Sequence, residues 1–256
     1  MNGAVDTAIV LAAGRGTRLR SFWPDLPKGF VKIAGESLIE RSARLLRAHG
    51  VRRIVIVAGY RADAYRELSN GHPDIEIVEN PEFATTESMA SLACALDVVK
   101  EDFLLLESDL FYEPRALEVL QSHACDDVVL TSSPTGATDE VWVHAVDGRL
   151  LNLTKNRDEA PAEACEFVGI LRISAALAQQ MRTAVDAFTR ANGHGRMAYE
   201  TGALLAAARR RRVEICLVPD LLWGEVDYDR HYERLVEEVL PACAHAERGA
   251  ASKGEP

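Results

Sequence analysis

The stretch LAAGRGTRLRSFWPDLPKGF, residues Leu11 to Phe30, follows the apolar run TAIVLA and opens with a glycine-containing turn. An apolar run that ends in such a turn is typical of the first strand and loop of an α/β sheet. Three arginines and a lysine lie in this stretch with Asp25 as its only acid, although the whole chain carries a net charge of −10. The loop is therefore a candidate anion site, and a solvated basic loop is the alternative that charge alone leaves open.

Two familiar phosphate-binding motifs do not fit this loop. A dinucleotide-binding fingerprint needs a third glycine where Leu19 stands, and an acid at the end of the second strand, which here ends VIVAGY. A P-loop needs GxxxxGK followed by Ser or Thr, and that spacing is absent. In the loop that remains, Gly14 and Gly16 let the backbone approach a phosphate chain. Arg18 and Lys28 are then placed to meet its charge.

The rest of the chain predicts an α/β fold, with a Rossmann-like, mixed, mostly parallel sheet and helices on both faces. In the first half, short strands alternate with helices, which is the pattern of βαβ units. Ser37 and Glu40 form a capping box that begins one of these helices, and Gly50 ends it. The strands expected in this half are TAIVLA, RRIVIVAG, IEIVE and DFLLLES.

The second half contains strands in close succession, for which mixed or antiparallel pairing is expected. These strands are DDVVLTSS, EVWVHAV, RLLNLT and CEFVGILRIS, with Asp147 to Arg149 as a hairpin turn. Helices are expected at about 175–190, 199–211 and 229–240. Because no linker or repeat divides the chain, a single domain is expected over residues 1–241. The small and polar residues 242–256 are expected to form a disordered tail.

Composition limits the class of protein. Of the 256 residues, 48% are hydrophobic and 27% are charged, as in a globular protein. No apolar run approaches the roughly 20 residues that span a bilayer, and the N-terminal MNGAVDTAIV lacks a signal-peptide pattern, so a cytoplasmic location is expected. The five cysteines lack CxxC spacing, which favours neither a zinc site nor a disulfide framework. The negative charge argues against general affinity for nucleic acid or anionic membranes.

The motif LxxGxGTRL followed by Pro-Lys resembles the signature of the nucleotidyltransferases that act on sugar phosphates and alcohol phosphates. Its match here is LAAGRGTRL with Pro27 and Lys28. The resemblance implies a nucleotide-diphospho-sugar transferase-like fold and a site that binds a nucleoside triphosphate. The nucleotide-binding residues that it implies in this loop are Leu11, Ala12, Ala13, Gly14, Gly16 and Thr17, and Arg18 and Lys28 are its catalytic residues.

Acidic residues stand where a magnesium ion would be needed to neutralise phosphate charge. Mg²⁺ is usually held by one or two carboxylates together with phosphate oxygens and water. Asp109 ends the strand DFLLLESD at the carboxyl edge of the sheet, where ligands of open α/β sheets bind. Glu225 and Asp227 alternate in LLWGEVDYD, and the family resemblance places a metal-binding acid pair in such a late WxExD segment. These three residues are the candidate Mg²⁺ ligands.

Longer segments resemble the cytidylyltransferases that act on phosphonates such as 2-aminoethylphosphonate, which are relatives of phosphocholine cytidylyltransferases. The resemblance runs from about Ala8 to about Leu240 and includes NPEFATTESMASLACAL, TKNRDEA and EFVGILRIS. It implies transfer of CMP from CTP to a small phosphonate, 2-aminoethylphosphonate or a hydroxyalkyl phosphonate, with release of pyrophosphate. Expected partners are CTP and a phosphonate or phosphate monoester, and the expected state is a monomer or homodimer. The alternatives are a phosphocholine cytidylyltransferase, a sugar-1-phosphate nucleotidyltransferase and a non-catalytic nucleotide-binding subunit.

The same resemblance assigns further site residues. Glu87 and Ser88 are expected beside the nucleobase with Gly59, although Glu87 stands where a glycine is expected and Ala90 where an aromatic residue is expected. Lys155 matches a catalytic lysine that meets the acceptor's phosphate or phosphonate. The candidate acceptor-binding residues are Asp139, Glu140, Glu166, Tyr199 and Glu200. A primary ammonium on the acceptor would need a carboxylate, which Asp139 or Glu140 could supply, whereas a hydroxyalkyl phosphonate would need neither.

Overall fold

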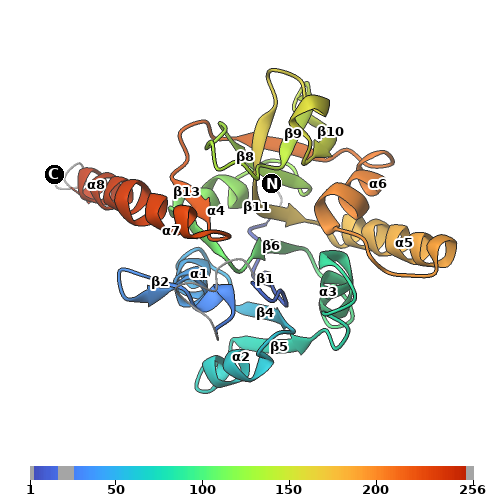
Figure 1. Ribbon diagram of the computed structural model, residues 1–256, viewed down its shortest axis with the longest axis horizontal. Coiled ribbons are helices and arrows are strands. Elements are labelled where there is room, and N and C mark those ends of the chain that lie inside the picture. The colour runs from blue at the N-terminus through green and yellow to red at the C-terminus, as the bar shows by residue number, and fades with distance from the viewer. Residues whose placement is uncertain (1–2, 17–25, 252–256) are drawn as a thin grey trace.

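A mixed sheet of nine strands forms the centre of this computed structural model, which describes residues 3–16 and 26–251 (Figure 1). The strands are β1 (Thr7–Ala12), β4 (Arg53–Ala58), β5 (Ile75–Glu79), β6 (Phe103–Glu107), β8 (Val128–Ser132), β9 (Trp142–Val146), β10 (Arg149–Thr154), β11 (Cys165–Ile173) and β12 (Glu214–Leu217). Their order across the sheet is β5-β4-β1-β6-β11-β8-β12-β10-β9. Two small antiparallel pairs lie outside it, β2 (Lys32–Ile33) with β3 (Glu36–Ser37), and β7 (Leu110–Tyr112) with β13 (Trp223–Glu225).

The sheet has a parallel half and a largely antiparallel half. Strands β5, β4, β1 and β6 are parallel neighbours. In the other half only β8 and β12 pair in parallel, and β9 closes back onto β11. The sequence predictions of βαβ units in the first half and mixed pairing in the second are confirmed.

Helices cover both faces of the sheet (Figure 1). They are α1 (Leu38–Ala48), α2 (Ala62–Ser69), α3 (Ser88–Ala95), α4 (Arg115–Gln121), α5 (Ala175–Asn192), α6 (Leu205–Ala208), α7 (Asp229–Arg234) and α8 (Leu240–Ala251), with 3₁₀ turns at Lys28–Phe30 and Arg157–Glu159 and π-helical turns at Tyr199–Leu204 and Leu235–Val239. Among the described residues, no helix is long and apolar enough to cross a membrane.

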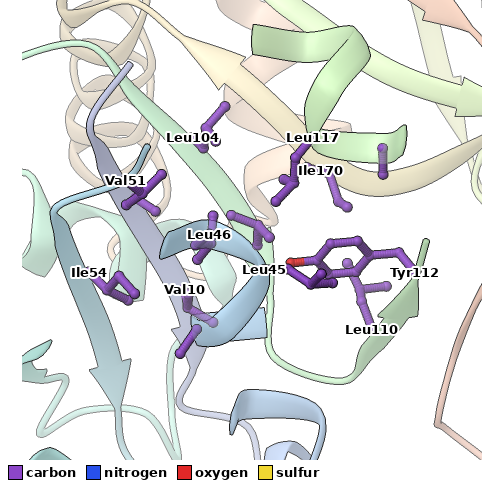
Figure 2. Close-up of a cluster of buried hydrophobic side chains, with 14 of the residues drawn as sticks. Val10, Leu45, Leu46, Val51, Ile54, Leu104, Leu110, Tyr112, Leu117 and Ile170 are labelled. Atoms are coloured by element: carbon purple, nitrogen blue, oxygen red, sulfur yellow. The ribbon is translucent and has the colours of Figure 1, made fainter. Parts of the chain in front are cut away.

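The alternation of side chains along β1 gives the molecule two core layers. Val10 packs into a cluster with α1, α2 and α4, whereas Ile9 packs into a cluster with α3, α5 and α6. Successive side chains of a strand point to opposite faces, so one apolar strand serves both layers. Figure 2 shows Val10 together with Leu45 and Leu46 of α1 in the first of these layers.

Local signals in the sequence set several element boundaries. Ser37 caps α1 with the expected capping box, since its side chain accepts from the Glu40 N–H and the Glu40 carboxylate accepts from the Ser37 N–H. Asp147 and Gly148 both have positive φ, of 51° and 73°, as a two-residue hairpin turn between β9 and β10 requires.

The end of the chain differs from the sequence prediction. Residues 242–256 were expected to be a disordered tail, but residues 242–251 belong to α8, and the last five residues lie outside the described part of the chain. Cys243 is buried in a third apolar cluster with Val31, Phe111 and Val226. The small residues of this segment therefore favour a helix that docks through its first turn, because alanine is a strong helix former.

Candidate active site

Two adjoining cavities lie at the carboxyl ends of the neighbouring strands β1 and β6, from which the chain continues to strands on opposite sides of this pair, β4 and β8. Ligands of open α/β sheets bind at such a switch point. One cavity, of about 360 Å³, is bordered by the glycine loop after β1. The other, of about 390 Å³, extends toward β11 and β13. Five side chains line both cavities, and they are Lys28, Glu107, Asp109, Lys155 and Glu200.

The glycine loop packs directly against the lysine of the Pro-Lys pair. Gly16 has a φ of +56°, and a Cβ there would lie 2.8 Å from Cγ of Lys28. A side chain at this position would therefore displace Lys28 as well as strain the backbone. The residues from Leu11 to Gly14 and Gly16, which are the predicted nucleotide-binding residues of this loop, line the first cavity. Thr17 and Arg18 lie outside the described residues.

The far wall of the first cavity is built around Phe83. A Cβ on Gly59 would lie 2.7 Å from Phe83 and 2.9 Å from the carbonyl oxygen of Ala13, so only glycine fits. The guanidinium of Arg15 lies over the Phe83 ring, 5.5 Å from its centroid. Sequence reasoning missed Phe83, although a phenylalanine in the polar segment NPEFATTES was an available signal.

Glu87 and Ser88 also line the first cavity. The Ser88 hydroxyl accepts a hydrogen bond from the Tyr199 N–H at 2.9 Å and lies 3.5 Å from the Glu200 carboxylate. The Ser88 hydroxyl thus connects the start of α3 to the π-helical turn that begins at Tyr199. Glu200 in turn holds Lys155, with 3.1 Å between the ammonium nitrogen and the carboxylate.

Lys28 forms ion pairs with the two aspartates expected to bind the metal. Its ammonium lies 2.9 Å from the Asp109 carboxylate and also contacts the Asp227 carboxylate. Burial lowers the pKa of Lys28, but the nearby Asp109 and Glu225 carboxylates outweigh burial, so that the net pKa is raised. Lys28 therefore remains a cation in this site.

The backbone brings the two aspartates together although 118 positions separate them (227 − 109). Strand β13 pairs with β7, which follows Asp109 directly. The Val226 N–H then donates to the Asp109 carbonyl at 3.0 Å, which sets Asp227 beside Asp109. The buried Val226 packs with Val31 and Phe111 and so fixes the Lys28 segment against the same place.

Among the residues that the structure describes, carboxylates outnumber ammonium groups around Lys28. Burial, and then repulsion from Asp109 and Glu107, raises the pKa of Glu225 well above its ordinary value. Burial raises the pKa of Glu107 too, assisted by Asp109 and Glu200 and opposed by a 2.7 Å hydrogen bond from the Tyr199 hydroxyl. Such crowding of buried carboxylates indicates a site that accepts additional positive charge. Hard oxygen donors of this kind fit Mg²⁺.

The second cavity carries most of the predicted acceptor residues. Asp139 and Glu140 line it from the loop before β9, and Glu166 lines it from β11. The Glu166 carboxylate accepts from the Thr135 N–H and hydroxyl, yet burial, the largest influence, raises its pKa to about 7. Tyr199 lines the first cavity and Glu200 lines both. Trp223 also borders this cavity, as do Phe167 and Tyr228, which sequence reasoning did not assign to the acceptor.

Comparison with known proteins identifies the family. A family model described as a MobA-like NTP transferase domain matches residues 8–212. The CMP-5'-(3-aminopropyl)phosphonate synthase of Streptomyces rubellomurinus is 31% identical over 86% of this chain, which spans only 36% of that relative. The 2-aminoethylphosphonate cytidylyltransferase of Lancefieldella rimae is 26% identical over 78% of this chain and 79% of its own length.

Solved structures share the fold. The inositol-1-phosphate CTP transferase from T. maritima matches 95% of this chain and 98% of its own, with a TM-score of 0.78 and 23% identity. The CTP:phosphocholine cytidylyltransferase from Streptococcus pneumoniae matches 91% of this chain and 98% of its own, with a TM-score of 0.72 and 18% identity. The nucleotide-diphospho-sugar transferase-like fold expected from the sequence is confirmed. With four fifths of its residues inside the matching family model, the chain belongs to the family of MobA-like NTP transferase domains.

Proposed function

We propose that this protein transfers CMP from CTP to a small phosphonate and releases pyrophosphate. The observation that supports it most is the pair of adjoining cavities that share Lys28, Lys155 and Asp109. Two anions that react with one another need cationic groups at their common border. Both curated relatives described above are named for making CMP-phosphonates.

The first cavity is the proposed CTP site. The glycine loop approaches the triphosphate with its backbone, and Arg18 and Lys28 neutralise its charge. Phe83, which packs on Gly59, bounds the space for the base, with Glu87 and Ser88 beside it. The second cavity is the proposed acceptor site, in which Lys155 faces the phosphonate group.

Mg²⁺ is the proposed cofactor, with Asp109, Glu225 and Asp227 as its ligands. Their carboxylates are crowded and partly buried, which is the donor set that this ion prefers. When bound, Mg²⁺ supplies charge neutralisation to the phosphate oxygens. In the structure described here, the ammonium of Lys28 contacts both aspartates.

The proposed reaction is a direct displacement. A phosphonate oxygen forms a bond to the α-phosphorus of CTP, the bond from this phosphorus to the bridging oxygen breaks, and pyrophosphate leaves with the electron pair. The phosphonate is already ionised near neutral pH, so the reaction requires no general base and no covalent enzyme intermediate. Lys28 and Lys155 act by positioning the two anions and neutralising their charge.

We further propose that the acceptor is an aminoalkyl phosphonate. An ammonium group needs a carboxylate partner, and Asp139, Glu140 and Glu166 line the second cavity beyond Lys155. CTP is a cytoplasmic metabolite, so the proposed location is the cytoplasm. The proposed state is a monomer or homodimer that acts on small molecules alone.

Pyrophosphate release by the purified protein with CTP and Mg²⁺ tests this proposal. Parallel reactions contain 2-aminoethylphosphonate, 2-hydroxyethylphosphonate, phosphocholine or glucose-1-phosphate, and each is repeated with the other common nucleoside triphosphates. Release with CTP and 2-aminoethylphosphonate, together with the CMP-phosphonate product by mass spectrometry, is the expected result. Release only with glucose-1-phosphate and another nucleotide would indicate a sugar-1-phosphate nucleotidyltransferase. Nucleotide-dependent thermal stabilisation without any product would indicate a binding subunit.

A further inference from the structure

One buried imidazole joins the two parts of the site that come from distant segments of the chain. His231, near the start of α7, is almost fully buried. Its Nδ1 lies 3.4 Å from the backbone nitrogen of Asp227, which carries one of the proposed Mg²⁺ ligands. Its Nε2 lies 3.2 Å from the carbonyl oxygen of Ala137 and 3.5 Å from the Asp139 carboxylate, in the loop that lines the acceptor cavity.

These partners fix the tautomer of the ring. A backbone N–H can only donate, so Nδ1 of His231 must be the unprotonated nitrogen that accepts from Asp227. A carbonyl oxygen can only accept, so Nε2 must carry the hydrogen that is donated to Ala137. Both nitrogens are engaged, and each holds a different segment.

The acceptor loop depends on this support. Thr138 has a φ of +75°, which is unfavourable for a β-branched residue. The Arg230 guanidinium donates to the Thr138 hydroxyl, and the ring of Tyr228 lies edge-on to His231 with 5.2 Å between centroids. The segment that follows Asp227 therefore holds the loop on both sides of its strained residue.

We propose that His231 is a positioning residue that sets the acceptor loop, with Asp139, relative to Asp227. The proposal rests on the function proposed above, because the two carboxylates face the acceptor and the metal respectively. Loss of either hydrogen bond lets the acceptor loop shift away from the reacting centre. The first cavity is lined by neither His231 nor Asp139, so we expect acceptor binding to depend on this link more strongly than CTP binding does.

A role as a metal ligand is the competing interpretation. Ligand atoms of Asp139, Glu225 and His231 all lie within 4.8 Å of one another. Coordination through Nε2 would require this nitrogen to lose its hydrogen while Nδ1 still faces an N–H donor, so the hydrogen bonds argue for positioning. Imidazole ligation would favour Mn²⁺ or Zn²⁺ over Mg²⁺, which makes the two roles separable by binding measurements.

Three variants of His231 test the proposal. His231→Asn retains an amide near the Nδ1 position, His231→Gln retains one near the Nε2 position, and His231→Phe retains the ring without either nitrogen. We expect KM for 2-aminoethylphosphonate to rise about tenfold to a hundredfold in His231→Phe. The Asn and Gln variants should recover part of this loss, and KM for CTP should rise less than KM for the acceptor in all three.

His49→Gln is the matched control. His49 is a partly buried histidine at the end of α1 whose ring bonds to the Leu45 carbonyl, away from both cavities. The control should keep both KM values. If His231→Phe does not fold, the KM values of the Gln and Asn variants are compared with those of the wild type instead. Equal rises in both KM values, or a wild-type acceptor KM in the Gln and Asn variants, would overturn the proposal.

A spectroscopic measurement tests the same link without catalysis. Imidazole ¹⁵N spectra of the labelled protein, with the His231 signal identified by its loss in His231→Gln, should show the tautomer protonated at Nε2. The opposite tautomer would overturn the proposal, as would stoichiometric Mn²⁺ or Zn²⁺ binding that His231→Gln abolishes. If the wild-type protein forms no product with any acceptor, the proposed function is contradicted. The tautomer of His231 would still test the link between Asp227 and the acceptor loop, because the ¹⁵N measurement does not depend on catalysis.

Discussion

Lys28 is the cation that pairs with both aspartates of the site. It contacts Asp109 and Asp227, supports the Gly16 turn and borders both cavities. Its position indicates a cation that serves the aspartates in the free protein and the phosphates when substrate is bound. Lysine suits this because its flexible stem carries a compact charge with three donors.

Lys28→Ala should lower turnover by about two to three orders of magnitude, which is the usual effect of losing one preorganised charged donor. Lys28 does not belong to the apolar core, so the fold should be retained and the circular dichroism spectrum should be unchanged. Steady-state pyrophosphate release measures the effect. Lys32→Ala, at an exposed lysine of β2, is the control and should keep full activity. Activity near the wild type in Lys28→Ala would contradict its assigned role.

Gly59→Ala should raise KM for CTP by about tenfold or more, because a displacement of Phe83 by even 1 Å misplaces the base. The new methyl group would lie 2.7 Å from Phe83 and 2.9 Å from the Ala13 carbonyl, closer than real Cβ contacts. Gly195→Ala is the control, since its Cβ would meet only Thr189 at an ordinary 3.6 Å. An unchanged KM for CTP in Gly59→Ala would show that Phe83 does not bound the nucleotide site.

At the scale of elements, the short strand pair β7 and β13 positions the acidic residues of the site. Its register places Glu225 opposite Leu110, and the Val226 N–H continues the ladder to the Asp109 carbonyl. The buried Val226 and Phe111 then pack against Val31. This contact holds together three segments of the site, which carry Lys28, Asp109, and Glu225 with Asp227.

Helix α1 follows the Lys28 segment and depends on its capping box. Ser37→Ala should lower the free energy of unfolding by about 1 kcal/mol, because it leaves the Glu40 N–H without its side-chain acceptor. Urea unfolding followed by circular dichroism measures the change. The control is Ser69→Ala at the exposed end of α2, where the hydroxyl bonds only to the Arg66 carbonyl. Equal effects in the two variants would mean that the capping box contributes nothing specific.

At the scale of the whole molecule, burial of carboxylates makes stability depend on pH. Burial raises the pKa of Glu166 from 4.5 to about 7. Between these values the folded protein keeps a proton that the unfolded chain has lost, so the free energy of unfolding falls as pH rises through this window. Burial of Glu166 therefore lowers the free energy of unfolding of the substrate-free protein at neutral pH.

Glu166→Gln should reduce this loss of stability between pH 5 and pH 8 by about 2 kcal/mol, since the amide does not titrate. Its oxygen can still accept from the Thr135 N–H. Urea unfolding at the two pH values measures the difference. Glu163→Gln, at an exposed glutamate two residues before Cys165, is the control and should leave the pH dependence as in the wild type. Identical pH dependence in both variants would contradict the assignment.

The sequence by itself determined most of the elements and supplied the candidate site residues. Apolar runs and the capping box fixed β1, α1 and the parallel strands, because hydrophobic period and capping are local properties. The glycine loop, Lys28 and the candidate acids were identifiable for the same reason, since each belongs to a short motif. The tail was misjudged because its small residues are equally common in loops and in helices that dock, and only the cluster around Cys243 separates the two.

The tertiary structure alone decided how these residues meet. Lys28 lies between Asp109 and Asp227 because the β7 and β13 pairing brings distant segments into contact, and no local pattern encodes such a register. Phe83 and His231 gain their places in the same way, from packing across the sheet edge. Charge crowding, the pKa shifts of buried carboxylates and the tautomer of an imidazole depend on neighbours in space, and those neighbours exist only once the chain has folded.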